Sequence, residues 1–151
     1  MKTYSLALGI LALAFFGRVL GQVLVAAFAP AFLPSMEEWY SGLLPYPLLL
    51  PTQIAILLFQ LGVSRQLWTG SGLLVQKRPA LGSALKWFAL VYFVVMVARY
   101  VISMVVFPER RWLGGTIPIF FHWVLALYLY LLSRYHVGLS LRSPSDLSRP
   151  S

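Results

Sequence analysis

Long apolar runs, separated by short polar segments, dominate the chain. Four of these runs reach the length of a membrane-spanning helix, at about residues 5–29, 47–65, 85–107 and 115–135. A helix needs about 20 apolar residues to cross the hydrocarbon core of a bilayer. Because lipid offers no partner to a free backbone N–H or C=O group, each run is expected to be helical. The pattern therefore predicts an all-α, polytopic integral membrane protein, a four-transmembrane-helix bundle with short loops.

The first run also resembles a secretory signal peptide, because Lys2 precedes it and an Ala-x-Ala cleavage pattern occupies residues 27–29. However, Pro30 follows this pattern directly, and Arg18 interrupts the run. The run is also longer than the apolar core of about 7–15 residues that is typical of signal peptides. We therefore expect the first helix to be retained.

The polar segments indicate how the chain is divided. Residues 30–47 contain prolines that end the first helix, and residues 64–84 contain the glycine, lysine and proline of a polar hairpin. From residue 137 the chain is rich in Ser, Arg and Pro and has few of the apolar residues that packing requires. The sequence therefore predicts one membrane domain, residues 1–136, followed by a disordered cytoplasmic tail, residues 137–151.

Composition agrees with this interpretation and excludes several classes of chemistry. Hydrophobic residues make up 60% of the chain and charged residues 11%, whereas soluble domains contain roughly 45–50% and about 25%. The net charge of +8 could indicate nucleic-acid binding, but the basic residues are scattered among apolar runs and form no known binding motif. We therefore expect no nucleic-acid partner. The absence of cysteine excludes disulfides, cysteine-bound metals and thiol catalysis.

The distribution of lysine and arginine predicts the orientation of the chain. If the N-terminus is inside, eight of the twelve basic residues fall on the cytoplasmic side, two fall outside and two lie within the spans. Those inside are Lys2, Arg65, Lys77, Arg78, Lys86, Arg134, Arg142 and Arg149, and those outside are Arg110 and Arg111. Such an excess is typical of cytoplasmic loops. Both termini are therefore expected in the cytoplasm, in a cell or inner membrane.

Six polar residues within the spans are expected at similar depth. At a rise of 1.5 Å per residue, this orientation places them in the outer half of the membrane. They are Arg18, Gln22, Gln53, Arg99, Ser103 and His122. An arginine at the centre of a bilayer costs about 2.5–3.5 kcal/mol on insertion scales, so both arginines should face a paired or solvated interior. The six residues thus predict a polar ligand-binding pocket that opens toward the outer surface.

The role of the two arginines within the spans has two interpretations, which differ in what neutralises their charge. No span contains an acidic residue, although Glu37 and Glu38 lie in the outer connector, where they could act as counter-ions or as a lid. If the guanidinium groups are free, they suit the phosphate or carboxylate of an anionic, lipid-like ligand, which they bind bidentately. In the structural alternative, Arg18 and Arg99 snorkel or bond the glutamines and backbone carbonyls, and so hold the bundle together.

Two further patterns concern partners and cofactors. Gly17 and Gly21 form a small-xxx-small pair, which allows close approach of another helix and suggests a face for a protein partner. His122 and His136 share roughly one face of the fourth span and could each ligate a haem, but the chain has no other histidine to complete the sites. We therefore expect no metal and no cofactor.

The sequence favours a non-catalytic function. It predicts a small binding protein or accessory subunit whose outer-half pocket takes an anionic or amphiphilic ligand such as a membrane lipid. One alternative is a membrane-embedded enzyme acting on a lipid or isoprenoid-type substrate, for which His122 is the main acid–base group within the spans. Another is an oligomeric transporter or channel subunit, although coupled carriers usually contain an intramembrane acid. The pattern does not determine the oligomeric state.

Overall fold

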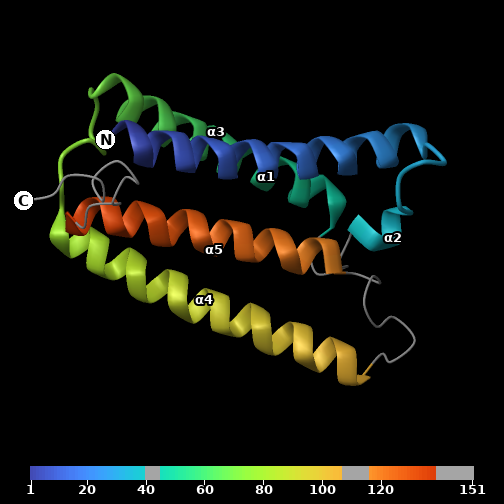
Figure 1. The fold of residues 1–151 in the computed structure, drawn as a ribbon. Helices are drawn as coiled ribbons and strands as arrows, with labels where there is room; N and C mark the ends of the chain where they lie inside the picture. The colour runs from blue at the N-terminus through green and yellow to red at the C-terminus, as the bar shows by residue number, and fades with distance from the viewer. Residues whose placement is uncertain (40–44, 107–115, 139–151) are drawn as a thin grey trace, which may run out of the picture.

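The fold is helical throughout the residues that the computed structural model describes, which are 1–39, 45–106 and 116–138. The helices are α1 (Lys2–Phe28), α2 (Met36–Trp39), α3 (Tyr46–Thr69), α4 (Pro79–Val106) and α5 (Thr116–Val137) (Figure 1). These residues contain no strand. The four long helices are each long and apolar enough to span a membrane. This confirms the predicted all-α, four-helix membrane fold.

The connection between α3 and α4 is shorter than predicted. The structure continues α3 to Thr69 and begins α4 at Pro79, so the polar hairpin expected over residues 64–84 occupies residues 70–78. A proline at the start of a helix loses no hydrogen bond, because the first N–H groups have no partner within the helix. Gly70 caps the end of α3 with a φ of 70°, a left-handed conformation that glycine adopts without strain. The predicted tail beyond residue 138 lies outside the described residues.

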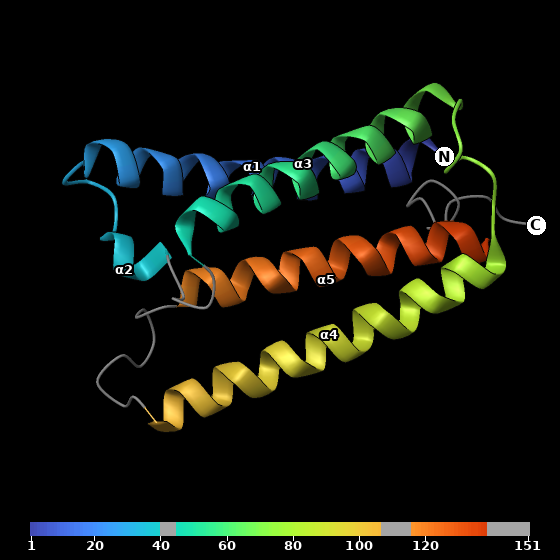
Figure 2. The same cartoon turned by 180° about the vertical axis from the view of Figure 1, so that it is seen from behind.

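The long helices pack in an open order. One side of α1 lies along α3 and another along α5, while α4 packs along α5 (Figures 1 and 2). The backbones of α3 and α4 do not approach each other anywhere along their described lengths. The order is therefore α3–α1–α5–α4, and the bundle is not closed by backbone packing between its first and last members.

The apolar core lies toward the end of the bundle that contains the N-terminus. Its buried members come from α1, α3 and α5: Tyr4, Leu8, Val63, Leu67, Tyr128, Leu132 and Tyr135. A smaller cluster of Phe15, Val19 and Leu57 joins α1 to α3. By contrast, only Gly82 and Ala89 are buried on α4. Most of the apolar surface of α4 therefore faces outward, as expected for a helix in contact with lipid.

The short helix α2 packs across the end of the bundle opposite to the N-terminus, against α1 and α5. A Cβ atom at Gly21 would lie 2.5 Å from the Trp39 ring, so glycine is required for this contact. The Trp39 indole also donates a hydrogen bond to the carbonyl of Pro34 at 3.1 Å. A Cβ atom at Gly17 would meet nothing within 4 Å. The chain's own α2 thus covers one half of the Gly17/Gly21 face, and only the Gly17 half stays open.

Candidate functional site

A cavity of about 160 Å³ brings together side chains from all four long helices. Its polar lining residues are Arg18 from α1, Thr52 and Gln53 from α3, Tyr92 from α4 and His122 from α5. Its apolar lining residues are Phe15, Leu49, Ile56, Pro118, Phe121 and Leu125. Three of the six residues predicted to form a polar pocket therefore line one cavity.

Arg18 supplies a buried positive charge to this cavity. The residue is 7% exposed, and its Nη2 donates a long hydrogen bond of 3.4 Å to the carbonyl of Trp39. Its guanidinium carbon lies 5.8 Å from the centre of the Phe121 ring. The buried Nε atom has no hydrogen-bond partner. At least one donor of the guanidinium therefore lacks a partner among the described residues.

Gln22 and Gln53 connect α1 to α3 beside the arginine. The Nε2 atom of Gln53 donates a hydrogen bond of 3.1 Å to Oε1 of Gln22, and both side chains are buried. The remaining amide atoms, Nε2 of Gln22 and Oε1 of Gln53, are buried without a partner. A buried polar atom left unpaired costs about 1–3 kcal/mol. Both atoms thus favour the presence of a polar ligand or of water.

His122 forms a hydrogen-bonded pair with Tyr92, a residue that was not predicted as part of the site. The Tyr92 hydroxyl and His122 Nδ1 share a hydrogen bond, and the two rings meet edge to face at 5.7 Å. This contact joins α4 to α5 at the cavity. The signal for Tyr92 was present in the sequence, because it precedes Arg99 by seven residues, a spacing that places both on one helical face.

The other predicted site residues lie outside the cavity lining. Arg99 is partly exposed on α4, within electrostatic range of Tyr92 and His122. Ser103 lies one turn further along the same helix and is also partly exposed. Glu37 and Glu38 belong to α2, but the described part of the structure does not include their side chains, so their role as counter-ions or lid stays a prediction.

Two fully buried polar residues lie elsewhere in the bundle. Both amide atoms of Gln60 lack a partner, while its backbone carbonyl accepts a hydrogen bond of 2.9 Å from the Tyr128 hydroxyl. His136 accepts a hydrogen bond from the backbone N–H of Arg78 at 3.4 Å. His122 and His136 are about 21 Å apart along α5 at 1.5 Å per residue. Within the described ranges, no cluster of three metal-ligating side chains occurs.

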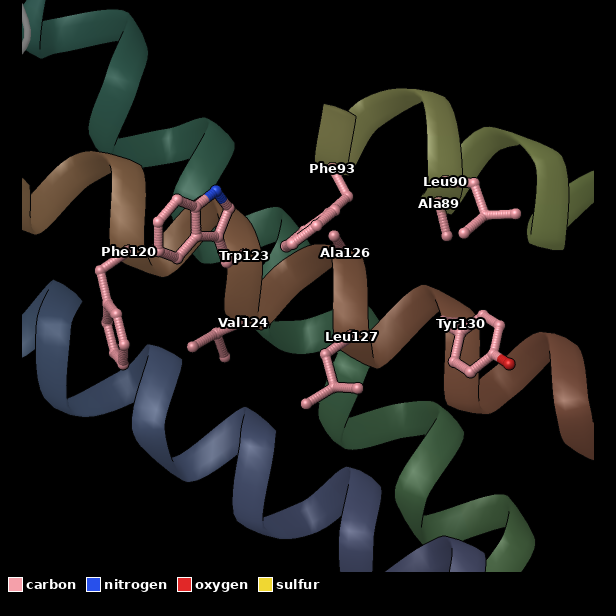
Figure 3. A pocket seen from close by; sticks show the side chains of 9 residues that line it. All are labelled: Ala89, Leu90, Phe93, Phe120, Trp123, Val124, Ala126, Leu127 and Tyr130. Atoms are coloured by element: carbon pink, nitrogen blue, oxygen red, sulfur yellow. The ribbon is translucent and has the colours of Figure 1, made fainter. Parts of the chain in front are cut away.

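A second, larger cavity of about 390 Å³ lies between α4 and α5 (Figure 3). It is lined by Ala89, Leu90 and Phe93 of α4 and by Phe120, Trp123, Val124, Ala126, Leu127 and Tyr130 of α5. The lining is almost entirely apolar, although the buried Nε1 atom of Trp123 has no hydrogen-bond partner. This groove can hold hydrocarbon but contains no charged group.

Comparisons of the chain with protein-family models, with curated proteins and with solved structures found no match. The function is therefore inferred from the cavities, of which two are described above. Only the smaller one combines a buried cation with unpaired polar atoms. Perturbed or unpaired polar groups that converge on a concave site are the usual sign of a binding site. The cavity around Arg18 is thus the candidate functional site.

Proposed function

We propose that the protein binds an anionic amphiphile without catalysing its conversion, and that the anionic head occupies the cavity around Arg18. The observation that supports this most directly is a buried guanidinium group whose Nε atom has no hydrogen-bond partner, in a cavity lined by four helices. A buried donor without a partner is costly, because low-dielectric surroundings do not solvate it. An anionic ligand that accepts from Nε would compensate that cost.

The hydrogen bonds around Arg18 favour a ligand over a purely structural role. A structural arginine should be saturated by glutamines or backbone carbonyls, but Gln22 and Gln53 bond each other. Arg18 keeps one long hydrogen bond to Trp39 and one unpaired donor. The planar guanidinium group can donate two parallel hydrogen bonds to one carboxylate or phosphate group. Nε2 of Gln22, one helical turn along α1 and outside the cavity lining, is a further unpaired donor.

Mass spectrometry of the lipids that copurify with the protein tests this proposal. The Arg18→Gln variant should lose a copurifying anionic amphiphile by about tenfold or more, because a hydrogen bond to a charged group contributes about 1.5–3 kcal/mol. Arg65→Gln is the matched control, since it removes the same charge from an exposed position on α3. An anionic amphiphile retained by a folded Arg18→Gln variant would contradict the proposal.

We also infer that the N-terminus and the end of α5 face the cytoplasm, with the Arg18 cavity in the outer half of the membrane. Support comes from the exposed basic residues Lys2, Lys77 and Arg78, which lie at or near the bundle end that contains the N-terminus. Membrane proteins concentrate lysine and arginine on the cytoplasmic side.

A further inference from the structure

We infer that the ligand is a single-chain amphiphile with a small anionic head, a carboxylate or a phosphate monoester, whose tail leaves the cavity sideways between α3 and α4. This inference rests on the proposed function and adds the class of ligand and its direction of entry. It follows from the size of the cavity, from its depth and from the contacts that surround it.

The size of the cavity limits what it can hold. Its volume is about 160 Å³. Pockets that enclose a whole drug-sized ligand measure about 300–1,000 Å³. The cavity therefore accommodates a small polar head but no bulky headgroup, and a hydrocarbon tail has to lie outside it.

The depth of the cavity disfavours a two-chain phospholipid held at the membrane surface. Arg18 lies about 5 Å past the middle of α1, at 1.5 Å per residue. The hydrocarbon core extends about 15 Å to each side of the bilayer centre, so the headgroups of surface lipids lie about 10 Å further out. A single-chain amphiphile can place its head at this depth while its tail continues within the hydrocarbon.

The contacts around the cavity leave a lateral direction for the tail. Toward the end of the bundle, Trp39 of α2 packs on Gly21 and its carbonyl accepts a hydrogen bond from Arg18. On the side, the backbones of α3 and α4 do not approach each other, and the cavity is lined there by the exposed Thr52 and the partly exposed Tyr92. The tail therefore leaves the head through this gap between the backbones of α3 and α4.

The surface beside this gap is suited to hydrocarbon. Phe88 stacks on Tyr92 with ring centres 5.9 Å apart, and 59% of Phe88 is exposed. On the opposite side of the gap, Ile56 lines the cavity and is partly exposed. A tail that leaves the head at Arg18 would thus lie between an aromatic pair on α4 and an aliphatic side chain on α3.

Photo-crosslinking in phosphatidylcholine vesicles tests both parts of the inference. The probes are hexadecanoic acid and hexadecyl phosphate with a diazirine in mid-chain, and hexadecanol with the same group is the neutral control. We expect at least one anionic probe to label peptides from α3 and α4 about tenfold more than the neutral probe, given the strength of charge-assisted hydrogen bonds. Labelling by one anionic probe alone would identify the head as carboxylate or as phosphate.

Variants separate this inference from the proposed function. Thr52→Trp, at an exposed position in the gap, should lower anionic labelling, whereas Leu58→Trp, exposed on α3 but outside the cavity lining, should not. Arg18→Gln should reduce labelling to that of the neutral probe. Suppose that labelling requires Arg18 but falls on the groove between α4 and α5, or is unchanged in Thr52→Trp. Either result overturns this inference and leaves the proposed function standing. Labelling that is unchanged by Arg18→Gln overturns the proposed function as well.

Discussion

Arg18, Gln22 and Gln53 concentrate unpaired polar atoms in a part of the bundle where apolar side chains would otherwise pack. Two helices supply them, and the hydrogen bond between the glutamines holds these helices in register. Within a bilayer, such a bond contributes only modestly, because the unfolded helices also find other partners. The glutamine pair is therefore expected to stabilise the α1–α3 contact modestly while it orients the site.

A double-mutant cycle on the glutamines measures this bond. Gln22→Leu and Gln53→Leu should each leave a buried amide unpaired, whereas the double variant removes both. We expect a coupling of about 0.6 kcal/mol, and no more than about 1.7 kcal/mol, in the free energy of unfolding in detergent micelles. Gln22→Leu combined with Thr69→Val, an exposed position, should be additive. If the effects of Gln22→Leu and Gln53→Leu on the free energy of unfolding are additive, the hydrogen bond between them does not contribute to stability.

At the level of the helices, the close approach of α4 to α5 determines how the outer helix is attached. Gly82 lies where a Cβ atom would meet a Val137 methyl group at 2.8 Å and the Ser133 carbonyl at 3.0 Å. One of these neighbours is backbone, which cannot move without shifting the helix. Since Gly82 and Ala89 are the buried residues of α4, the pairing of these helices depends on small side chains.

Gly82→Ala should therefore destabilise the bundle by about 1–3 kcal/mol, the usual effect of overpacking. Thermal unfolding in detergent, followed by circular dichroism, measures the change. Gly62→Ala on α3 is the control, because a Cβ atom there would meet nothing within 4 Å. It should leave the stability unchanged or raise it by up to about 1 kcal/mol, because alanine favours a helix over glycine. Equal effects of the two substitutions would mean that α4 and α5 do not pack as described.

For the whole molecule, the distribution of charge gives the bundle two different ends. Lys2, Lys77 and Arg78 are exposed at or near the end where α1 begins and α5 finishes. Among the described residues at the opposite end, beyond Arg18 and Arg99, there is no lysine or arginine. The cytoplasmic leaflet carries anionic lipid, which attracts such basic segments.

Cysteine labelling in intact cells tests the inferred orientation, and the cysteine-free chain makes each added thiol unique. Ser35→Cys, next to α2, should react with a membrane-impermeant maleimide, whereas Ser71→Cys, between α3 and α4, should react only after the cells are permeabilised. Both serines are exposed in the structure, so burial does not explain a difference. The reverse pattern would place the Arg18 cavity in the cytoplasmic half.

The helices could be predicted because a bilayer forces each spanning segment to satisfy its own backbone hydrogen bonds. Length and hydropathy were therefore sufficient for all four spans. The ends were less predictable. Polar residues near the membrane surface do not stop a helix, and α4 begins at Pro79, six residues before the predicted residue 85.

The sequence alone predicts which residues lie at similar levels along the bundle, since the rise along a helix is constant. Of the six residues placed at one level, Arg18, Gln53 and His122 line one cavity. Tertiary structure alone decided the rotation of each helix about its axis and which neighbours it has. It brought Tyr92 to the cavity, left Arg99 outside its lining, and separated α3 from α4. The physical reason is that rotation and neighbours depend on side-chain packing between helices, such as the contact at Gly82, which no single helix encodes.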